Sequence, residues 1–307
     1  MARKFEVRNA KAEDLSFPTH FAITNNWRFG PSDVSCAYDF DPSGFFVGEL
    51  DGKVISHVNM TKYPEHSAFI GGFMCQEEQR GKGYGKKTWD TAWKTLDQSC
   101  NIGLEALHHM IPKYESLGLR VVWNTPVAFL DFNKILQNLA NSETPLGVSV
   151  MPIKTADREK VLLYDTSVFG TSRRVLIERW LNIPGRLGWA AVNGKGVVVG
   201  FNVVRPTIIG KGTEFALTIA PFIADNYDIA KALLKTAAKE CLANDAIPVS
   251  NFEMLFPNGG EAGPQAAQLV AKVEATTTPF SARMYTKGIP RGRQVTKEYS
   301  IIHPAFD

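Results

Sequence analysis

Three glycines alternate with larger residues in the stretch Gln79–Lys87, which reads Gln-Arg-Gly-Lys-Gly-Tyr-Gly-Lys-Lys. The apolar run Ala68–Cys75 before it predicts a strand, and the residues after it, 86–96, carry apolar side chains at the i, i+3, i+4 and i+7 spacing of a helix. Glycine permits positive φ and close backbone approach, so successive N–H groups can point toward an anion at the helix start. The chain therefore turns from strand to helix through a segment suited to hold a phosphate or pyrophosphate.

The segments around this turn indicate a mixed α/β unit. Asp51-Gly52 separates two apolar runs, which is typical of a β-hairpin. From Val121 to about Met151 the chain has no strong periodicity. The patterns predict hairpin strands at residues 45–50 and 54–60, further strands at 5–8 and 101–107, and a short helix at 112–117 that Gly118 ends.

The second half of the chain repeats much of this order. The whole chain of 307 residues suits about two domains of roughly 150 residues each. The stretch 141–147, Asn-Ser-Glu-Thr-Pro-Leu-Gly, has the composition of a linker. We expect a domain at 1–140 and a related one at 148–307. The second half predicts strands at 148–153, 188–193, 196–204 and 215–219 and helices at 175–181 and 227–242.

Composition excludes several classes of function. The 34 basic and 31 acidic residues leave a net charge of +3, too small to predict a nucleic-acid partner. No apolar run reaches the roughly 18 residues of a membrane helix, and the first residues lack the apolar core of a secretory signal. The four cysteines have no CxxC spacing, so we expect a reduced, cytoplasmic compartment and no metal site.

The glycine-rich turn fits the common nucleotide motifs poorly. A P-loop would end in Gly-Lys-Ser/Thr, whereas Thr88 follows two lysines. A dinucleotide fingerprint needs Gly-x-Gly-x-x-Gly, and this run has glycine at every second position. Binding of ATP or NAD, and a turn without a ligand, stay open on the residues alone.

The spacing Arg80-x-x-Gly83-x-Gly85 resembles motif A of the GNAT N-acetyltransferases, Q/R-x-x-G-x-G/A. The later segments Leu104-Glu105-Ala106 and Pro112–Leu119 resemble the strand and helix that follow that motif, and short strings such as 169–173 and 282–288 resemble a two-domain subgroup. The resemblance implies a mixed, mostly antiparallel sheet with splayed central parallel strands, flanked by helices. A degenerate GNAT-like α/β domain follows it, and one cofactor site lies in the first domain.

The resemblance also implies acetyl-CoA as cosubstrate, held between the splayed strands. The main chain of Met74 and Cys75 is expected to pair with the pantetheine amides. The pyrophosphate is expected against the backbone of Arg80, Gly81, Lys82, Gly83, Tyr84, Gly85 and Lys86.

A catalytic set follows from the same resemblance. An amine attacks the thioester directly, and Tyr114 is expected to protonate the departing thiolate. The general base is left open between Glu105, His108 or His109, and water alone. Cys75 is expected to be a strand residue without a nucleophilic role.

The acceptor pocket is expected beside the N-terminal helical region. Trp27, Phe29 and Tyr38 can form an aromatic wall, and Asp33 and Asp39 can attract a cationic amine or simply face solvent. We interpret the chain as an N-acetyltransferase for a small-molecule or peptide amine. The alternative is a non-catalytic GNAT-like module that binds an acyl-CoA or a partner. The second domain is expected to cap the acceptor site, form a homodimer or bind a separate ligand, and Arg291-Gly292-Arg293 is expected to be a solvated turn.

Overall fold

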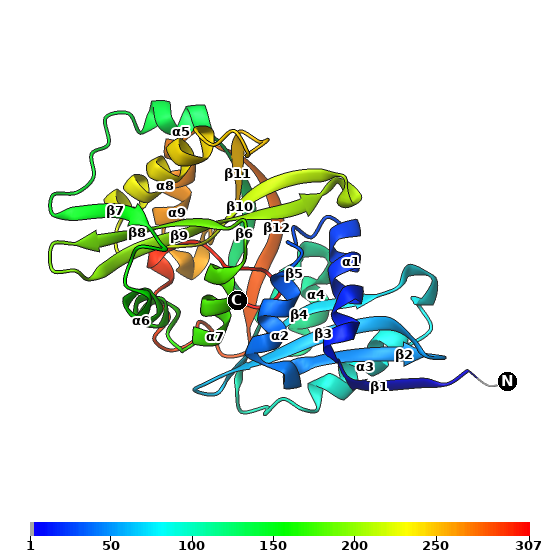
Figure 1. Cartoon of the computed structure of the whole chain (residues 1–307). Helices are drawn as coiled ribbons and strands as arrows, with labels where there is room; N and C mark the ends of the chain where they lie inside the picture. Colours follow the sequence, from blue (N-terminus) through cyan, green and yellow to red (C-terminus); the bar gives the residue numbers. More distant parts are fainter. Residues whose placement is uncertain (1–2) are drawn as a thin grey trace.

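A computed structural model describes residues 3–307 of the chain, and its strands join in one continuous sheet with helices on its faces (Figure 1). The strand order is β1-β2-β3-β4-β5-β12-β6-β11-β10-β9-β8-β7, and β13 pairs with β10. The strands are β1 (Phe5–Asn9), β2 (Phe45–Leu50), β3 (Lys53–Tyr63), β4 (Ser67–Cys75), β5 (Asn101–Leu107), β6 (Arg120–Asp131), β7 (Val148–Pro152), β8 (Leu187–Asn193), β9 (Val198–Ile209), β10 (Glu214–Ala224), β11 (Asn251–Leu255), β12 (Thr276–Tyr285) and β13 (Glu298–Ser300). The helices are α1 (Ser16–Thr24), α2 (Asp33–Phe40), α3 (Tyr84–Trp93), α4 (Ile111–Glu115), α5 (Phe132–Asn138), α6 (Arg158–Phe169), α7 (Arg174–Asn182), α8 (Tyr227–Leu242) and α9 (Gln265–Lys272).

The predicted sheet class is confirmed: neighbouring strands are mostly antiparallel, and β4 and β5 form a parallel pair near the centre. The hairpin at Asp51-Gly52 is confirmed, with Leu50 opposite Lys53. Both turn residues have positive φ, which suits this two-residue turn. The predictions for 101–107 and 227–242 match β5 and α8 along their whole length.

The two halves of the chain exchange strands at the middle of the sheet. β12, from the second half, pairs with β5 on one side and β6 on the other. β6, from the first half, also pairs with β11 and so joins the strands of the second half. The residues 141–147 lie between α5 and β7 without helix or strand. A division into two domains at this linker stays a prediction, because strands from before and after the linker pair with each other in the sheet.

The weakly periodic stretch after Val121 folds as the long strand β6 and helix α5, which the sequence analysis did not predict. Pro126 lies inside β6 and cannot donate to the ladder. The pairing with β12 is irregular there, because its register shifts between Thr278 and Ser281. The strand also lacks simple alternation of buried and exposed residues, so a period of two does not mark it in the sequence.

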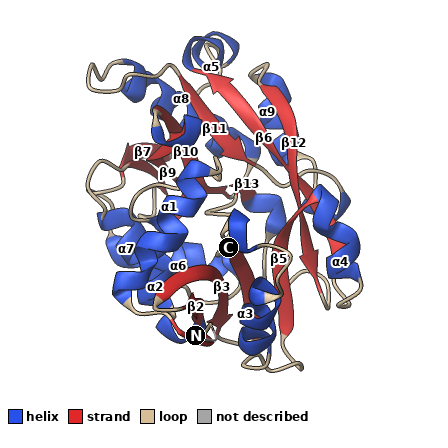
Figure 2. Ribbon diagram, turned by 90° about the vertical axis from the view of Figure 1, so that its right-hand side faces the viewer, coloured by secondary structure: helices blue, strands red, loops and turns tan. Residues whose placement is uncertain are grey.

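Apolar packing crosses between the halves. Phe45 and Val47 of β2 belong to the same buried cluster as Trp180 of α7 and Ile223 of β10. Helix α7 packs against α2, and the two lie near each other in Figure 2. This shared cluster packs the two halves against each other.

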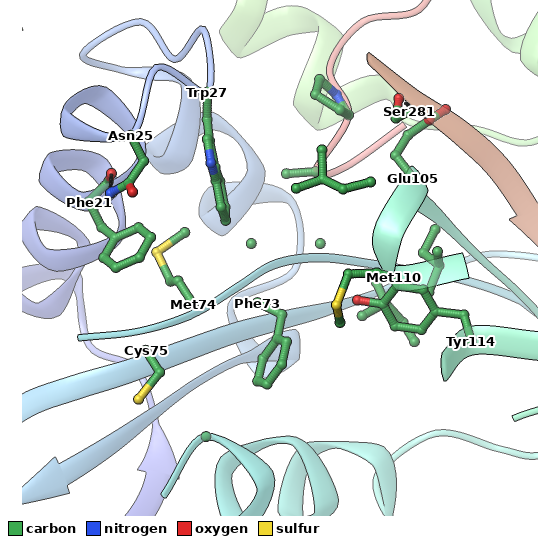
Figure 3. Close-up of a pocket in the computed structure, with 18 of the residues that line it drawn as sticks. Phe21, Asn25, Trp27, Phe73, Met74, Cys75, Glu105, Met110, Tyr114 and Ser281 are labelled. Carbon is green, nitrogen blue, oxygen red and sulfur yellow. Dashed lines mark hydrogen bonds between the residues drawn. The ribbon is translucent and has the colours of Figure 1, made fainter. Parts of the chain in front are cut away.

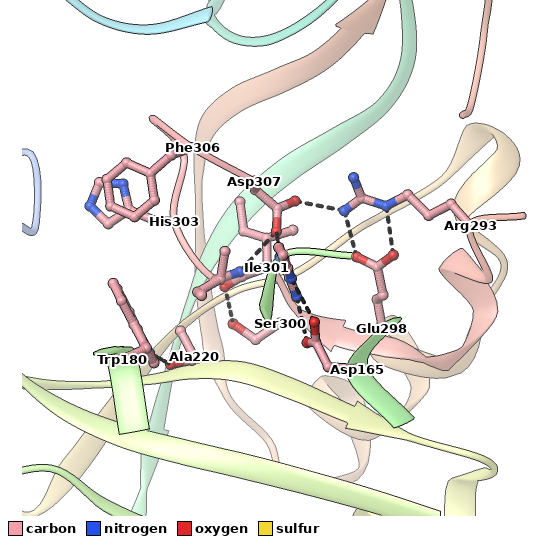
Figure 4. Close-up of polar contacts among 12 residues, drawn as sticks. Asp165, Trp180, Ala220, Arg293, Glu298, Ser300, Ile301, His303, Phe306 and Asp307 are labelled. Carbon is pink, nitrogen blue, oxygen red and sulfur yellow. Dashed lines mark hydrogen bonds and ion pairs between the residues drawn. The ribbon is translucent and has the colours of Figure 1, made fainter. Parts of the chain in front are cut away.

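A buried ion network surrounds Asp307 (Figure 4), and Arg283 extends it to Glu105 of the first half. The Asp307 carboxylate accepts hydrogen bonds from Arg173 at 3.2 Å, Arg283 at 2.7 Å and Arg293 at 2.6 Å. Burial alone would raise the pKa of this carboxyl, but the charges of Arg293, Arg283 and Arg173 hold it far below its usual value. Arg293 is thus buried and paired with Glu298, which corrects the expectation of a solvated turn at that residue.

We predict that the buried ring of His57 on β3 makes stability fall in mild acid. Burial lowers the pKa of His57 to about 4, although Nδ1 lies 2.9 Å from the Gly72 oxygen. The unfolded ring has a pKa of about 6.5, so its contribution is present above that pH and is lost as the pH falls toward 4. His57 should remove about 2 kcal/mol of unfolding free energy between pH 7 and pH 5.

Urea unfolding at both pH values tests this, with His57→Gln and the exposed-site variant His20→Gln compared with the original chain. We expect the loss on acidification to shrink in His57→Gln alone. An equal loss in all three proteins would contradict the assignment to His57.

Candidate functional site

Strands β4 and β5 separate at their carboxyl ends. Their parallel pairing runs from Ser67 opposite Asn101 to Ile70 opposite Leu104, and no pairing follows, although β4 continues to Cys75. The bulge in β4 at this point includes Gly72, with φ +55°. A wedge therefore opens in the middle of the sheet, where the sequence predicted splayed strands.

Main-chain direction along β4 decides which groups face this wedge. The Gln76 N–H donates to the Ile55 oxygen on β3 at 2.8 Å. Because such bonds alternate along an antiparallel strand, the main chain of Met74 also faces β3, whereas Phe73 and Cys75 face the wedge. The expected main-chain role thus fits Cys75 and Phe73. Met74 contributes its side chain, which points into the cavity in Figure 3.

The glycine-rich turn lies at the open end of the wedge and leads into α3. Gly81 and Gly83 have φ of +76° and +81°, a conformation that only glycine adopts at little cost. In residues 3–307, no protein oxygen accepts a hydrogen bond from the N–H of Gly81, Lys82 or Gly83. Tyr84 then begins α3, whose first N–H groups have no carbonyl one turn earlier. This row of free donors at a helix N-terminus suits a pyrophosphate.

A cavity of about 810 Å³ fills the wedge and reaches the turn. Most of the residues predicted to bind the cofactor line it, and Lys82 and Tyr84 do not. The side chain of Lys82 instead donates to the Glu78 oxygen and the Tyr84 ring packs on Phe5, so these two offer only their main chain. The lining residues from the prediction are Met74, Cys75, Arg80, Gly81, Gly83, Gly85, Lys86, Glu105 and Tyr114.

Tyr114 lies on α4, with its ring 5.9 Å from that of Trp89. Burial raises the pKa of its hydroxyl to about 12, so the phenol keeps its proton at neutral pH. Figure 3 places its oxygen at the end of the cavity beside Met110. A protonated hydroxyl that faces the wedge can give a proton to a group bound there.

Glu105, which also lines the cavity, already accepts hydrogen bonds from three side chains. Its Oε1 accepts from Arg283 at 2.6 Å and Thr125 at 3.1 Å, and its Oε2 accepts from Ser281 at 2.7 Å. Both histidines after β5 are exposed, but only His109 lines the cavity and His108 lies outside it. His108 is therefore poorly placed for the predicted base, and its role stays a prediction.

The aromatic wall is partly as expected. Trp27 and Phe29 line the cavity, whereas Tyr38 packs on Phe45 and donates to the Ala10 oxygen. Asp33 neither faces solvent nor the cavity: it is fully buried and paired with Arg186 and Arg205. The exposed carboxylate of Asp39 pairs with Arg179 at 3.2 Å.

Several lining residues were missed by the sequence analysis. Phe280 and Ser281 come from β12, and Pro304 and Ala305 come from the segment after β13. A Cβ on Gly71 would lie 1.9 Å from the Ala305 oxygen, so this segment rests directly on β4. The missed residues are far from the motif along the chain and carry no local signal for it.

Two other features bear on the predictions. Burial raises the pKa of the Cys75 thiol, which disfavours the reactive thiolate. Away from the cavity, His66, Asp97 and Cys100 hold ligand-type atoms within 4.8 Å of one another. Among residues 3–307, none of the helices has the length and apolar character needed to cross a membrane.

Comparison with known proteins agrees with this geometry. The Acetyltransferase (GNAT) family matches residues 10–123, and an Acetyltransferase (GNAT) domain matches residues 161–296. The chain belongs to the GNAT acetyltransferase family. It contains two GNAT domains by these matches, in agreement with the tandem arrangement that the sequence resembled.

The individual proteins that resemble this chain are distant from it in sequence. The holothin acyltransferase of Pseudoalteromonas sp. is 23% identical over 198 residues, which span 64% of this GNAT chain and 64% of that relative. A candidate acetyltransferase from Pyrococcus horikoshii has a TM-score of 0.71 at 18% identity, over 99% of this chain and 96% of its own. A tandem GNAT protein from the clavulanic acid biosynthesis pathway has a TM-score of 0.61 at 15% identity, over 92% and 98%. These two structures share the fold.

Proposed function

We propose that this protein transfers an acetyl group from acetyl-CoA to a primary amine. The free N–H groups of the glycine-rich turn at the mouth of the β4–β5 wedge are the observation that carries the proposal. Three features suit an acyl-CoA: a cradle for a pyrophosphate, a strand edge for amides and a cavity of about 810 Å³. The similarity to holothin acyltransferase supports transfer of an acyl group by this chain.

In the proposed reaction, the nitrogen of a neutral amine attacks the carbonyl carbon of the thioester. The carbon–sulfur bond breaks, and the sulfur takes the proton of the Tyr114 hydroxyl. The surplus proton on nitrogen passes to water, from which the phenolate regains a proton. Tyr114 suits this role because burial keeps it protonated, with a pKa of about 12, and its oxygen faces the cavity. Glu105 is left to orient the amine, since its oxygens already accept three hydrogen bonds.

Release of free CoA thiol in the presence of amines tests the activity. We expect Tyr114→Phe to lower kcat by about 100-fold or more, as is usual for loss of a positioned proton donor. Acetyl-CoA affinity should stay near that of the original chain, because phenylalanine keeps the packing on Trp89. Tyr227→Phe, on α8 and outside the cavity, is the matched control.

The outcomes separate two functions. Full activity of Tyr114→Phe would remove the tyrosine from the mechanism. Acetyl-CoA binding without thiol release for any amine would favour a binding module over an enzyme.

A further inference from the structure

The end of the cavity beyond the wedge is built by both halves of the chain. Phe21 and Trp27, whose rings meet edge to face at 5.7 Å, form one side. Phe280 and Pro304 of the second half form another. In Figure 3, Trp27 and the Glu105–Ser281 pair lie on opposite sides of the space above β4. This end is therefore a slot between aromatic side chains with one polar wall.

Phe280 owes its position to an irregularity in β12. The register of β12 against β6 shifts between Thr278 and Ser281, so an extra residue stands there opposite Pro126. A bulge turns a side chain away from its regular direction, and bulges recur beside active sites. The Arg28 guanidinium lies 5.6 Å from the centre of the Phe280 ring. The same guanidinium pairs with Glu253. The second half thus supplies a wall of the slot as well as a strand.

The charges around the slot are already neutralised. Among the described residues that line the cavity, Glu105 is the one carboxylate, and Arg283 binds it at 2.6 Å. Asp33 is held by Arg186 and Arg205, and Glu253 is held by Arg28. An ammonium group that entered this slot would lose its water without finding a free counter-charge, which is costly.

The hydrogen bonds of Glu105 leave room for one more donor. A carboxylate has about four acceptor positions. Arg283 and Thr125 use those of Oε1, and Ser281 uses one of Oε2. The remaining position on Oε2 can accept a single N–H from a neutral amino group at the polar wall.

We propose that the acceptor is a compact aromatic or heteroaromatic amine whose weakly basic amino group is neutral at physiological pH, and that Phe280 and Trp27 select it. The proposal rests on the proposed transferase function. Aromatic faces pack favourably against such a ring, and Glu105 orients its amino group. A neutral amine also needs no strong base before attack, in keeping with a site whose one carboxylate is already paired.

Initial rates of thiol release with saturating acetyl-CoA test the proposal on the full chain. The panel compares an aniline and an aminothiazole with spermidine, an aminoglycoside and a lysine-containing peptide. We expect kcat/KM to be at least about 100-fold higher for the aromatic amines. Equal or higher values for any of the three cationic amines would overturn the substrate class and leave the transferase function intact. Absence of thiol release with every amine would overturn both.

Phe280→Ala adds a test of the slot itself. Loss of a buried aromatic contact should raise the KM for the aniline about 10-fold. The dissociation constant for acetyl-CoA should change less than about twofold in the same comparison. Phe215→Ala, at an exposed position on β10, is the matched control, and Trp27→Leu is the second variant if Phe280→Ala folds poorly. Unchanged KM in both slot variants would contradict selection by these rings.

Discussion

Aspartate in place of Gly83 should abolish detectable binding of acetyl-CoA while the fold persists. Gly83 has φ +81° at the start of α3, and a Cβ there would meet no atom within 4 Å, so the substitution strains the backbone but clashes with nothing. The larger effect is electrostatic. Two like charges about 4 Å apart cost on the order of 4 kcal/mol at an effective dielectric constant of 20. We therefore expect affinity to fall more than about 100-fold.

Gly52→Asp is a matched control for this result. Gly52 has the same φ of +81° and the same open space around a Cβ, but it lies in the β2–β3 hairpin turn. Calorimetric titration of acetyl-CoA should give affinity near that of the original chain for Gly52→Asp. Similar weakening in both variants would mean that backbone strain, and not the position of Gly83, causes the loss.

Methionine in place of Arg283 should destabilise the protein by about 3–5 kcal/mol, the usual cost of breaking a buried ion pair from one side. The Arg283 side chain is fully buried and donates to Glu105 at 2.6 Å and to Asp307 at 2.7 Å. Its removal leaves Glu105 without a charged partner and takes one of three arginines from Asp307. Chemical unfolding at neutral pH measures the difference in unfolding free energy.

Arg179→Met provides the comparison, because Arg179 pairs with Asp39 at the surface, with side chains 63% and 41% exposed. Such a surface pair contributes at most about 1 kcal/mol. The difference between the two variants is the expected result. Equal effects would show that the buried network around Asp307 does not hold the halves together.

Local patterns in the sequence were enough to predict the parts of the fold that short-range chemistry determines. The Asp51-Gly52 turn requires positive φ, and the limits predicted for β5 and α8 match the structure because each carries its own apolar pattern. The glycine-rich turn was also found locally, since its spacing and its position before α3 are contained in nine residues.

The exchanged strands could not be predicted in this way. β6 contains Pro126, and its buried residues do not alternate regularly with exposed ones, so no period of two marks it as a strand. Asp33 was expected to attract a cationic amine or to face solvent, because its partners Arg186 and Arg205 lie 153 and 172 residues away and give no local signal. Phe280 was missed for the same reason: its place in the cavity depends on pairing between distant segments.

Hydrogen exchange, with and without saturating acetyl-CoA, tests the central claim that an acyl-CoA binds in the β4–β5 wedge against the glycine-rich turn. We predict slower exchange of the amides of Phe73 and Cys75 and of residues 81–86, because these main-chain groups face the wedge or lack protein acceptors. Slower exchange confined to residues 148–307, or no change in any segment, would contradict the account.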